Sequence, residues 1–534
     1  MICGARRSTI LLGGIVLFFL VVFLHRNDLS DHVPQLSTQQ PFLSPRDRLN
    51  ITTSRPEDLK KVQLLLPAAS GQESLCKTLL TAAVLGYPIP TLVAYNRTYT
   101  QPNLVGGGRH VAKIEAISTY LENIPKSKDS DLVIIVDAYG GFNYQHNPES
   151  IESHMVGDAW FQLPLEVLVD RYRAVMGRAN KDLEISMGKA YRAAAVNQTI
   201  LFGSSKRCTP NNVQSSACYP VPESPLSLKL YGKYTDAPSL EVGQGDYVTY
   251  RQRFLNSGFI VGPVRDLRPL FRRAQRKASD QIRLSQTSDD GSSTINKLHV
   301  GSDQAIFSAI LGEQEFQREA MRRKYGERPR PKSRIVNVPI EDILDPSFPH
   351  EVLQPKGDKS GEFGIVVDYW SDLEMQTADN DEDGRWLLYN QPVQEQLLAV
   401  PRQPWSCVPQ VSNLLPGELI NSTSIPRAAI SESSQFSPTH GWDEVPLYTN
   451  ICLDTIPVVV NHNGDPRQRQ RDWPQMWMQP HGRRLIEEII ARGQGGKEER
   501  GGAYHGKYQK WVKLCPSTLE NELYREESYN NEMV

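Results

Sequence analysis

The chain has 534 residues, with 59 Lys and Arg against 61 Asp and Glu, and its formal net charge is −2. This length suits one large domain with appendages, or two to three domains. Because the charges are nearly balanced, bulk electrostatics gives no reason to expect a nucleic-acid partner. A hydrophobic content of 39%, with 37 Gly and 37 Pro, is that of a globular protein rich in loops.

One short apolar stretch stands near the N-terminus. Ile10 to Leu24 is almost wholly apolar, with two arginines before it and polar residues after it. It is shorter than the about 17–25 residues usual for a membrane span, but a short span suits the thinner membranes of the early secretory pathway. No small-residue cleavage site follows it, and the positive flank places the N-terminus in the cytoplasm. We therefore predict a cytoplasmic tail over residues 1–8 and a transmembrane signal anchor over residues 9–25; a cleaved signal peptide is the alternative.

The rest of the chain is then expected in the lumen of the Golgi or the endoplasmic reticulum, as in a single-pass type II membrane protein. Residues 26–60 are rich in Ser, Pro, Gln and Asp without apolar periodicity, and we predict that they form a stem. N-glycosylation sequons begin at Asn50, Asn96, Asn197 and Asn421. An even number of cysteines follows the anchor, which in an oxidising compartment indicates disulfides. Cys208 and Cys218 bracket a short polar loop and are the pair that we expect.

Strand and helix patterns alternate from about residue 61 onward. The predicted strands cover residues 62–66, 89–94 and 132–136, and the predicted helices cover residues 75–85 and 111–124. This alternation is the start of a doubly wound α/β domain. The glycine run before the second helix either cradles phosphate or is a flexible turn.

The remaining patterns complete a domain that we place at residues 61–480, followed by a C-terminal helix and tail over 481–534. Strands are predicted over 200–203, 254–263, 363–369 and 457–464, and helices over 165–174, 266–274 and 305–311. Four further segments are expected on the surface. Residues 276–300 are predicted to be a polar loop, and residues 317–334 a solvated basic helix face. Residues 379–383 are predicted to be an acidic surface loop, and residues 493–508 a flexible tail.

The strand at residues 132–136 ends at a carboxylate. Its five residues are apolar and four of them are β-branched, which is typical of a strand buried on both faces of a mainly parallel sheet. Asp137 follows directly. Open α/β sheets bind ligands at the carboxyl ends of their strands, and an aspartate there can hold a metal ion against a phosphate. The alternative is an ordinary turn or capping aspartate.

Several short motifs share the order found in a known family. They are Val105 to Val111, Asp131 to Tyr139, Glu166 to Leu168, Leu255 to Gly258, Ser302 to Gln304 and Val459 to Gly464. Over about residues 60–470 the chain resembles a GT-A glycosyltransferase. It is most similar to the glycosyltransferase domain of procollagen lysyl hydroxylases and to fungal type II membrane proteins related to it. The resemblance implies a GT-A-like α/β fold, with a mixed, mostly parallel sheet flanked by helices, behind the N-terminal transmembrane anchor. Too few residues follow for the hydroxylase domain of that family.

The resemblance also implies roles for single residues. Transfer from a nucleotide sugar is assisted by a divalent cation, usually Mn²⁺, which neutralises the diphosphate leaving group as a Lewis acid. The implied metal ligands are Asp137, Asp158 and His462. The implied donor-binding residues are Gly107, Gly108, Arg109, His110, Asn463 and Gly464. The implied catalytic residues are Asp303 and Asn256.

Two of these assignments have open alternatives. Related sequences read His-x-Asn-Gly, which places Asn461 at the ligand position and His462 one residue later. His462 is then either a ligand or a hydrogen-bonded histidine at a strand end. Asp303 is either the residue next to the acceptor or transferred sugar, or the N-cap of a helix.

The family's second aspartate is displaced in this chain. It is expected three residues after Asp137, where Gly140 stands, and the family's continuation begins instead at Asp158. Removing residues 140–157 would restore the pattern. Two explanations stay open, an unspliced in-frame intron in the gene or a genuine loop insertion that brings Asp158 back to Asp137. Sequencing the transcript separates them. Reads that skip codons 140–157 would support the intron, and reads that contain these codons would support the insertion.

The sequence thus favours a metal-dependent glycosyltransferase that uses a nucleotide sugar, a UDP-hexose, as donor and a protein or glycan as acceptor. Membrane contact is expected through the one N-terminal helix. The first alternative is a catalytically inactive relative that binds glycans or acts as a scaffold, which the displaced Asp158 favours. The second is a nucleotide-sugar hydrolase, which acceptor dependence would separate from a transferase.

Overall fold

The computed structural model describes residues within Leu49–Val534. The described residues are 49, 51–68, 73–97, 100–101, 103–138, 158–211, 215–232, 247–287, 300–328, 330, 361–399, 407–423, 425, 441–492 and 501–524. The expected anchor and residues 140–157 lie outside these ranges. Within them, none of the helices combines the length and the apolar character that a membrane crossing requires.

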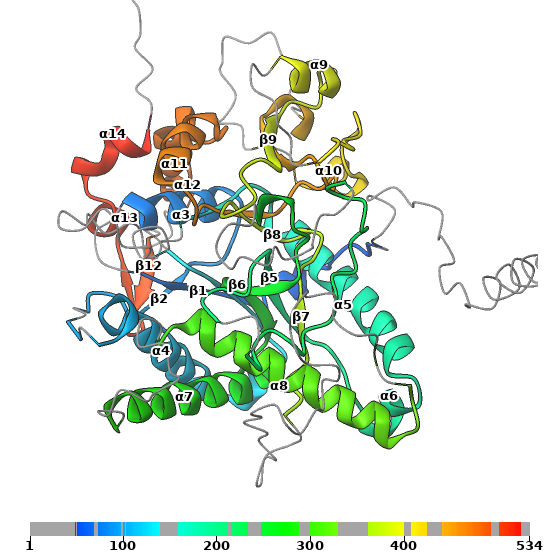
Figure 1. Cartoon of the computed structure of the whole chain (residues 1–534). Helices are drawn as coiled ribbons and strands as arrows, with labels where there is room; N and C mark the ends of the chain where they lie inside the picture. The colour runs from blue at the N-terminus through cyan, green and yellow to red at the C-terminus, as the bar shows by residue number, and fades with distance from the viewer. Residues whose placement is uncertain are drawn as a thin grey trace, which may run out of the picture. The chain divides into compact units, whose positions relative to one another are not determined.

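The fold is α/β and is built on one mixed eight-stranded sheet (Figure 1). Its strands, in spatial order, are β13 (Lys507–Gln509), β12 (Gly502–Tyr504), β2 (Thr91–Val93), β1 (Val62–Pro67), β3 (Leu132–Val136), β6 (Phe254–Pro263), β5 (Ile200–Ser205) and β7 (Ile365–Val367). β12, β2, β1 and β3 run parallel, as do β5 and β7, whereas β6 is antiparallel to β3 and β5, and β13 to β12. The predicted α/β class with a mixed sheet is therefore confirmed.

Strand β3 lies in the middle of this sheet, between β1 and β6. Ile134 and Val136 belong to the hydrophobic core on one face, and Val133 and Ile135 belong to the core on the other. All four side chains are fully buried. Successive side chains of a strand point to opposite faces of the sheet. The unbroken apolar run of β3 is therefore explained by the hydrophobic cores that cover both faces.

Helices cover both faces of the sheet. One core contains α4 (Arg109–Asn123), α7 (Val264–Thr287) and α8 (Asp303–Lys324), which lie below the sheet in the view of Figure 1. The other core contains α3 (Glu73–Val84), α5 (Leu165–Met187) and α12 (Gly482–Arg492). The remaining helices are α2 (Pro56–Leu59), α6 (Lys189–Ala194), α9 (Val393–Leu398), α10 (Gly417–Ile420), α11 (Pro466–Asp472), α13 (Trp511–Leu514) and α14 (Glu520–Leu523).

Two small sheets complete the described fold. In the first, β11 (Val459–Asn461) lies between β4 (Ala159–Phe161), to which it is antiparallel, and β8 (Glu374–Gln376), to which it is parallel. In the second, β9 (Gly384–Leu387) pairs with β10 (Leu447–Asn450). The first matters most for the site, because the strands that form it carry or adjoin several of the predicted functional residues.

The predicted helix ends are wrong where distant residues stabilise the helix. α7 continues through Thr287, well into the predicted loop over 276–300. Its Arg273 and Lys277 both form ion pairs with Glu313 of α8, a partner that local sequence does not reveal. α8 likewise extends from Asp303 to Lys324, far past the predicted end at residue 311.

Two other predicted surface segments are buried in part. In the basic segment 317–334, Arg318 is only 3% exposed and pairs with Glu315 and Glu362, so this helix face is not simply solvated. The predicted flexible tail over 493–508 is wrong in its second half. Residues 502–504 and 507–509 are strands of the large sheet, because β12 pairs with β2 and β13 pairs with β12 at the edge.

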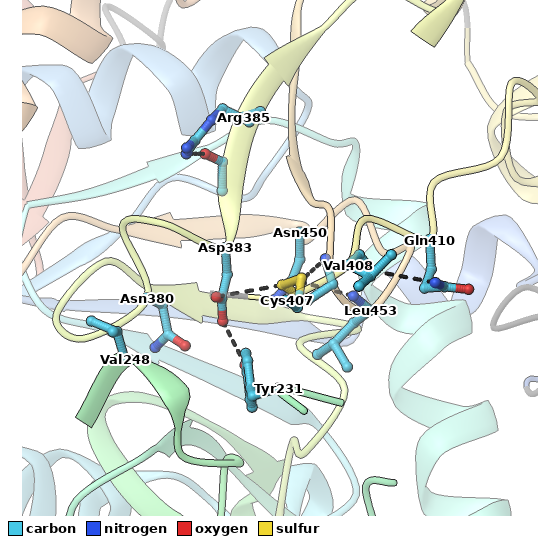
Figure 2. The surroundings of a disulfide bond; sticks show 12 residues. Tyr231, Val248, Asn380, Asp383, Arg385, Cys407, Val408, Gln410, Asn450 and Leu453 are labelled. Carbon is cyan, nitrogen blue, oxygen red and sulfur yellow. Dashed lines mark hydrogen bonds between the residues drawn. A yellow bond between two sulfur atoms is a disulfide. The ribbon is translucent and has the colours of Figure 1, made fainter. Parts of the chain in front are cut away.

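The predicted acidic surface loop over 379–383 is also wrong at its end. Asp383 is fully buried and accepts hydrogen bonds from Lys206 Nζ at 2.9 Å and from the Tyr231 hydroxyl at 2.6 Å. Figure 2 shows Asp383 beside the disulfide between Cys407 and Cys452. A buried ion pair and a disulfide therefore meet where β9 begins.

All six cysteines that follow the expected anchor are paired. The predicted Cys208–Cys218 disulfide is confirmed. Cys407 pairs with Cys452, and Cys76 of α3 pairs with Cys515, which follows α13.

The Cys76–Cys515 disulfide should stabilise the unit far more than the short one. It joins residues 439 apart, whereas Cys208 and Cys218 are 10 apart. Loop-closure entropy then predicts that Cys76→Ser with Cys515→Ser lowers the unfolding free energy by about 6 kcal/mol, against about 3 kcal/mol for Cys208→Ser with Cys218→Ser. Denaturant unfolding of both double variants measures this difference, and an equal loss in the two would contradict it.

Candidate functional site

The carboxyl end of β3 places Asp137 beside β6. The Asp137 N–H donates to the carbonyl of Gly258 at 3.0 Å, which continues the ladder between the two strands. The Asp137 side chain is 20% exposed, although its strand is buried. Burial raises the pKa of Asp137, against the effect of the Lys113 ammonium beside it.

A buried lysine joins Asp137 to Asp303. Lys113 of α4 is 1% exposed, and its Nζ donates to Asp137 Oδ2 at 2.8 Å, to Asp303 Oδ2 at 2.6 Å and to the Ser257 carbonyl at 3.0 Å. Burial opposes the charged ammonium, but the two carboxylates raise the pKa of Lys113 above its usual value. An ammonium has three N–H donors, and all three have acceptors here.

Sequence reasoning missed Lys113, although a signal existed. It lies four residues before Ile117 and eight before Leu121, both fully buried, so it continues the apolar stripe of α4. A lysine on such a stripe must find an acceptor, because an unpaired buried charge is costly. What the sequence did not reveal is which carboxylates accept from it.

Asp303 collects three hydrogen bonds at the start of α8. Besides Lys113, it accepts from the Ser257 hydroxyl at 3.1 Å and from His110 Nδ1 at 2.5 Å. Burial alone would raise its pKa, but the Lys113 ammonium and His110 hold the pKa of Asp303 well below its usual range. The capping alternative is wrong, since the N-cap is Ser302, whose side chain accepts from the Ala305 N–H. Asp303 is therefore an ionised carboxylate held in one orientation.

The glycine turn adjoins the same cluster. Val105–Gly108 form one 3-10 turn that leads into α4, with Gly107 and Gly108 at φ +66° and +97°. The N–H of Val105 donates to the carbonyl of Val300, just before α8. Arg109 is buried at the first position of α4. The turn thus sets Arg109 and His110 at the helix start that faces Asp303.

Asn256 belongs to a second group, which we call the amide seam and define as Asn256, Gln376 and Asn463. Gln376 Oε1 accepts from Nδ2 of Asn256 and, at 2.9 Å, from Nδ2 of Asn463. The neighbouring Gly464 N–H donates to Thr377 Oγ1 at 3.2 Å. The seam joins a predicted catalytic residue to a predicted donor-binding residue through Gln376, which sequence reasoning missed.

The third group contains Asp158 and His462. The His462 N–H donates to the Asp158 carbonyl at 2.8 Å, and Ala159 is paired with Asn461 in the antiparallel ladder. His462 therefore lies opposite Asp158 and stacks on Trp160, with 3.8 Å between ring centroids. Asn461 points the other way, because a Cβ on Gly258 would collide with its Nδ2. The register thus favours His462 over Asn461 as the partner of Asp158.

The side chains of this third group fit a divalent cation in their chemistry. Asp158 Oδ1 and both ring nitrogens of His462 are buried without a hydrogen-bond partner. Burial raises the pKa of Asp158 to about 6 and lowers the pKa of His462 well below its usual value. A neutral imidazole and a carboxylate are ligands that Mn²⁺ accepts. Across the described ranges, however, no three His, Cys, Asp or Glu side chains converge on one point.

Both ends of the segment 140–157 border the same part of the fold. Ala138 pairs with Ala68, which follows β1. Asp158 lies within electrostatic range of Glu73 and Lys77 at the start of α3, the helix that comes after Ala68. An insertion that loops out from this edge is therefore compatible with Asp137 and Asp158 serving one site.

A neutral buried acid lies next to the amide seam. Glu374 of β8 is fully buried, and a Cβ on Gly203 of β5 would collide with its carboxyl group. Burial raises the pKa of Glu374 well above its usual value, and the nearby Asp368 adds to the shift. Glu374 therefore keeps its proton in the folded state at pH values at which the same side chain is ionised in the unfolded chain.

Glu374→Gln should make stability less dependent on pH. A group whose pKa is raised on folding stabilises the fold at low pH, and this contribution is lost as pH rises above its unfolded value of 4.5. The loss amounts to about 1.4 kcal/mol per pH unit while only the folded state holds the proton. Gln mimics the protonated acid, so the variant should match the wild type near pH 4.5 and exceed it at pH 7.5. Urea unfolding across this range measures the difference, with the exposed Asp280→Asn as control; parallel pH profiles would contradict the assignment.

The comparisons with known proteins leave the site to be judged on its own geometry. No protein-family model matches this chain, and no curated protein sequence matches it. The predicted site residues fall into three groups, around Asp303, around Gln376 and around His462. The first two groups meet at β6, whose consecutive residues Asn256 and Ser257 contribute one side chain to each.

Proposed function

We propose that this chain is a metal-dependent glycosyltransferase that transfers a hexose from a UDP-sugar to a protein or glycan acceptor. The observation that carries the proposal is the cluster of Asp137, Asp303, Lys113 and His110 at the end of β3. Ligand sites of open α/β sheets lie beyond the carboxyl ends of their strands. Buried charged groups with strongly shifted pKa values are typical of functional sites, and both features coincide here.

The leaving group of such a transfer is a diphosphate, whose charge grows as the glycosidic bond breaks. A divalent cation, Mn²⁺ or another, would neutralise that charge. Asp158 and His462, which face each other across β4 and β11, would hold it. Asp137, the third ligand that the resemblance implies, pairs with Lys113 and does not converge with them in this structure, so it would join them only after a rearrangement.

Asp303 would face the acceptor or the transferred sugar, where its ionised carboxylate can stabilise positive charge that develops on the sugar. Its lowered pKa makes it a poor acceptor for a hydroxyl proton. Lys113 fixes the positions of the Asp137 and Asp303 carboxylates relative to each other. Gly107 and Gly108, with Arg109 and His110 directly after them, would lie against the donor.

The wider architecture supports a GT-A-like enzyme of the secretory pathway. The sheet has its parallel strands on the β3 side and the antiparallel β6 next to them, and the cluster lies at that junction. Three disulfides fit an oxidising lumen. The sequon asparagines Asn96, Asn197 and Asn421 are exposed. We therefore place the enzyme in the Golgi or endoplasmic reticulum membrane as a type II protein.

A second candidate function has two specific observations in its favour. The Lys113 ammonium already neutralises Asp137, and the segment 140–157 separates Asp137 from Asp158. Both would suit an inactive relative that binds glycans or acts as a scaffold. Incubation with Mn²⁺ and a panel of UDP-hexoses, with UDP release as readout, separates the two functions. Turnover supports the transferase, and glycan binding without turnover supports the scaffold.

Deleting residues 140–157 should leave the domain folded and restore or raise its activity. The reason is that Ala138 pairs with Ala68, directly after β1, and Asp158 lies within electrostatic range of Glu73 and Lys77 of α3, so we expect that a short connection can join them. The thermal midpoint and the Mn²⁺-dependent UDP release of the full-length and deleted chains give the comparison. A deleted chain that does not fold would show instead that the segment is part of the native structure.

A further inference from the structure

The amide seam lies where the three-stranded sheet meets the large sheet. Asn256 comes from β6, Gln376 ends β8, and Asn463 follows β11. Asn256 and Gln376 are 7% and 4% exposed, whereas Asn463 is half-buried. The seam therefore runs from the protein interior to a partly exposed asparagine.

Gln376 fixes both asparagines of the seam. Its Oε1 accepts from the Nδ2 of each of them. At their other ends, Asn256 Oδ1 accepts from the Gly258 N–H at 2.6 Å, and Asn463 Oδ1 accepts from the Ala378 N–H at 3.1 Å. Each carboxamide is thus bonded through both its nitrogen and its oxygen, so neither can turn over without losing two hydrogen bonds.

A carboxamide of fixed orientation can tell one hydroxyl arrangement from another. Its NH₂ group has two N–H donors and its oxygen has two lone pairs. The seam uses one N–H of Asn463, and the other is directed by the same bond to Gln376. If the group could flip, donor and acceptor would exchange places and the discrimination would be lost. A site built to hydrogen-bond a hydroxyl rejects a ligand in which that hydroxyl is misplaced, because buried polar groups are left unpaired.

We propose that Gln376 is a positioning residue that sets the hexose selectivity of the donor site by fixing Asn256 and Asn463. This inference rests on the proposed function and deepens it, because it names the group that reads the sugar hydroxyls. Gln376 acts only through the two asparagines, so its removal should change which sugar is preferred as well as how well any sugar binds.

The test compares Gln376→Met with Gln376→Glu in the full-length chain. Met has nearly the same shape but cannot accept from the two NH₂ groups, whereas Glu keeps an acceptor oxygen. UDP-glucose and UDP-galactose, which differ at one hydroxyl, serve as probes with Mn²⁺ present. The readouts are the Kd for each, from titration calorimetry, and kcat/KM for UDP release. We expect Gln376→Met to reduce the ratio between the two donors by about 10-fold or more, with the change mainly in Kd and KM, and Gln376→Glu to keep it.

Gln162 is a matched control for packing. It is fully buried next to β4 in the same small sheet, and it bonds only backbone, with Nε2 donating to the Tyr448 carbonyl at 3.0 Å and Oε1 accepting from the Tyr448 N–H at 2.9 Å. Gln162→Met should lower stability without changing the donor ratio. An unchanged ratio in Gln376→Met, or an equal change in Gln162→Met, would overturn the inference while leaving the proposed function standing. If the wild type and the chain lacking residues 140–157 bind neither donor, the proposed function and the inference both fail.

Discussion

Lys113→Met is expected to destabilise the folded domain by about 3–5 kcal/mol, because it leaves the buried carboxylates of Asp137 and Asp303 facing each other without their shared cation. Met keeps the length and the apolar stem of the lysine, so the loss of unfolding free energy measures the contribution of the charge and its hydrogen bonds. Equilibrium unfolding in urea measures it. Lys128→Met, at an exposed lysine after α4, is the control and should have almost no effect.

A double variant separates charge from packing in this prediction. Asp303→Asn removes one of the two carboxylates, so Lys113→Met combined with Asp303→Asn should lose less stability than Lys113→Met alone plus Asp303→Asn alone. Residues in one ion-pair network show such coupling. Strict additivity of the two single effects would mean that Lys113 acts on Asp303 only through its volume.

Asp303→Asn should reduce kcat by about 10²–10⁴-fold, the range typical of a lost acid–base or charge-stabilising group. The substitution keeps the shape of the side chain and removes the negative charge that Lys113 and His110 hold in place. Donor affinity should change much less, because the donor is expected to bind through other residues. Steady-state kinetics together with calorimetric Kd values for the donor test both statements.

The chain offers a close control for that substitution. Asp266 stands in the first turn of α7 as Asp303 stands in the first turn of α8, so Asp266→Asn removes a first-turn carboxylate outside the cluster. It should leave kcat unchanged. If Asp303→Asn also keeps full activity, Asp303 is structural and the assignment of its role is wrong.

The elements that could be predicted from the sequence are those whose cause is local. The unbroken apolar run at residues 132–136 predicts a strand that is buried on both faces of the sheet, and β3 has these bounds. β6 matches its prediction from Phe254 to Pro263, although polar residues interrupt its apolar sequence. The disulfide between Cys208 and Cys218 spans a short loop, so chain connectivity alone brings the two thiols together.

The features that could not be predicted depend on partners far along the chain. Lys113 meets Asp303 across 190 residues, and Asp383 meets Lys206 across 177. The end of α7 depends on Glu313, 40 residues beyond Arg273. Gln376 was overlooked because a glutamine in a short strand carries no signal of its own; only the fold brings it to Asn256 and Asn463. Distance along the chain thus limits what residue patterns can reveal about a site.

The central claim is that the cluster at the end of β3 transfers a sugar from a UDP-hexose with the help of a divalent cation. The most direct measurement is UDP release by the full-length chain and by the chain lacking residues 140–157, with each UDP-hexose in turn, with Mn²⁺ and with chelator. We predict that at least one donor is turned over with Mn²⁺, that chelation stops the reaction, and that Asp303→Asn abolishes it in the same preparation. Absence of turnover with every donor in both chains, when both are shown to be folded, would contradict the claim.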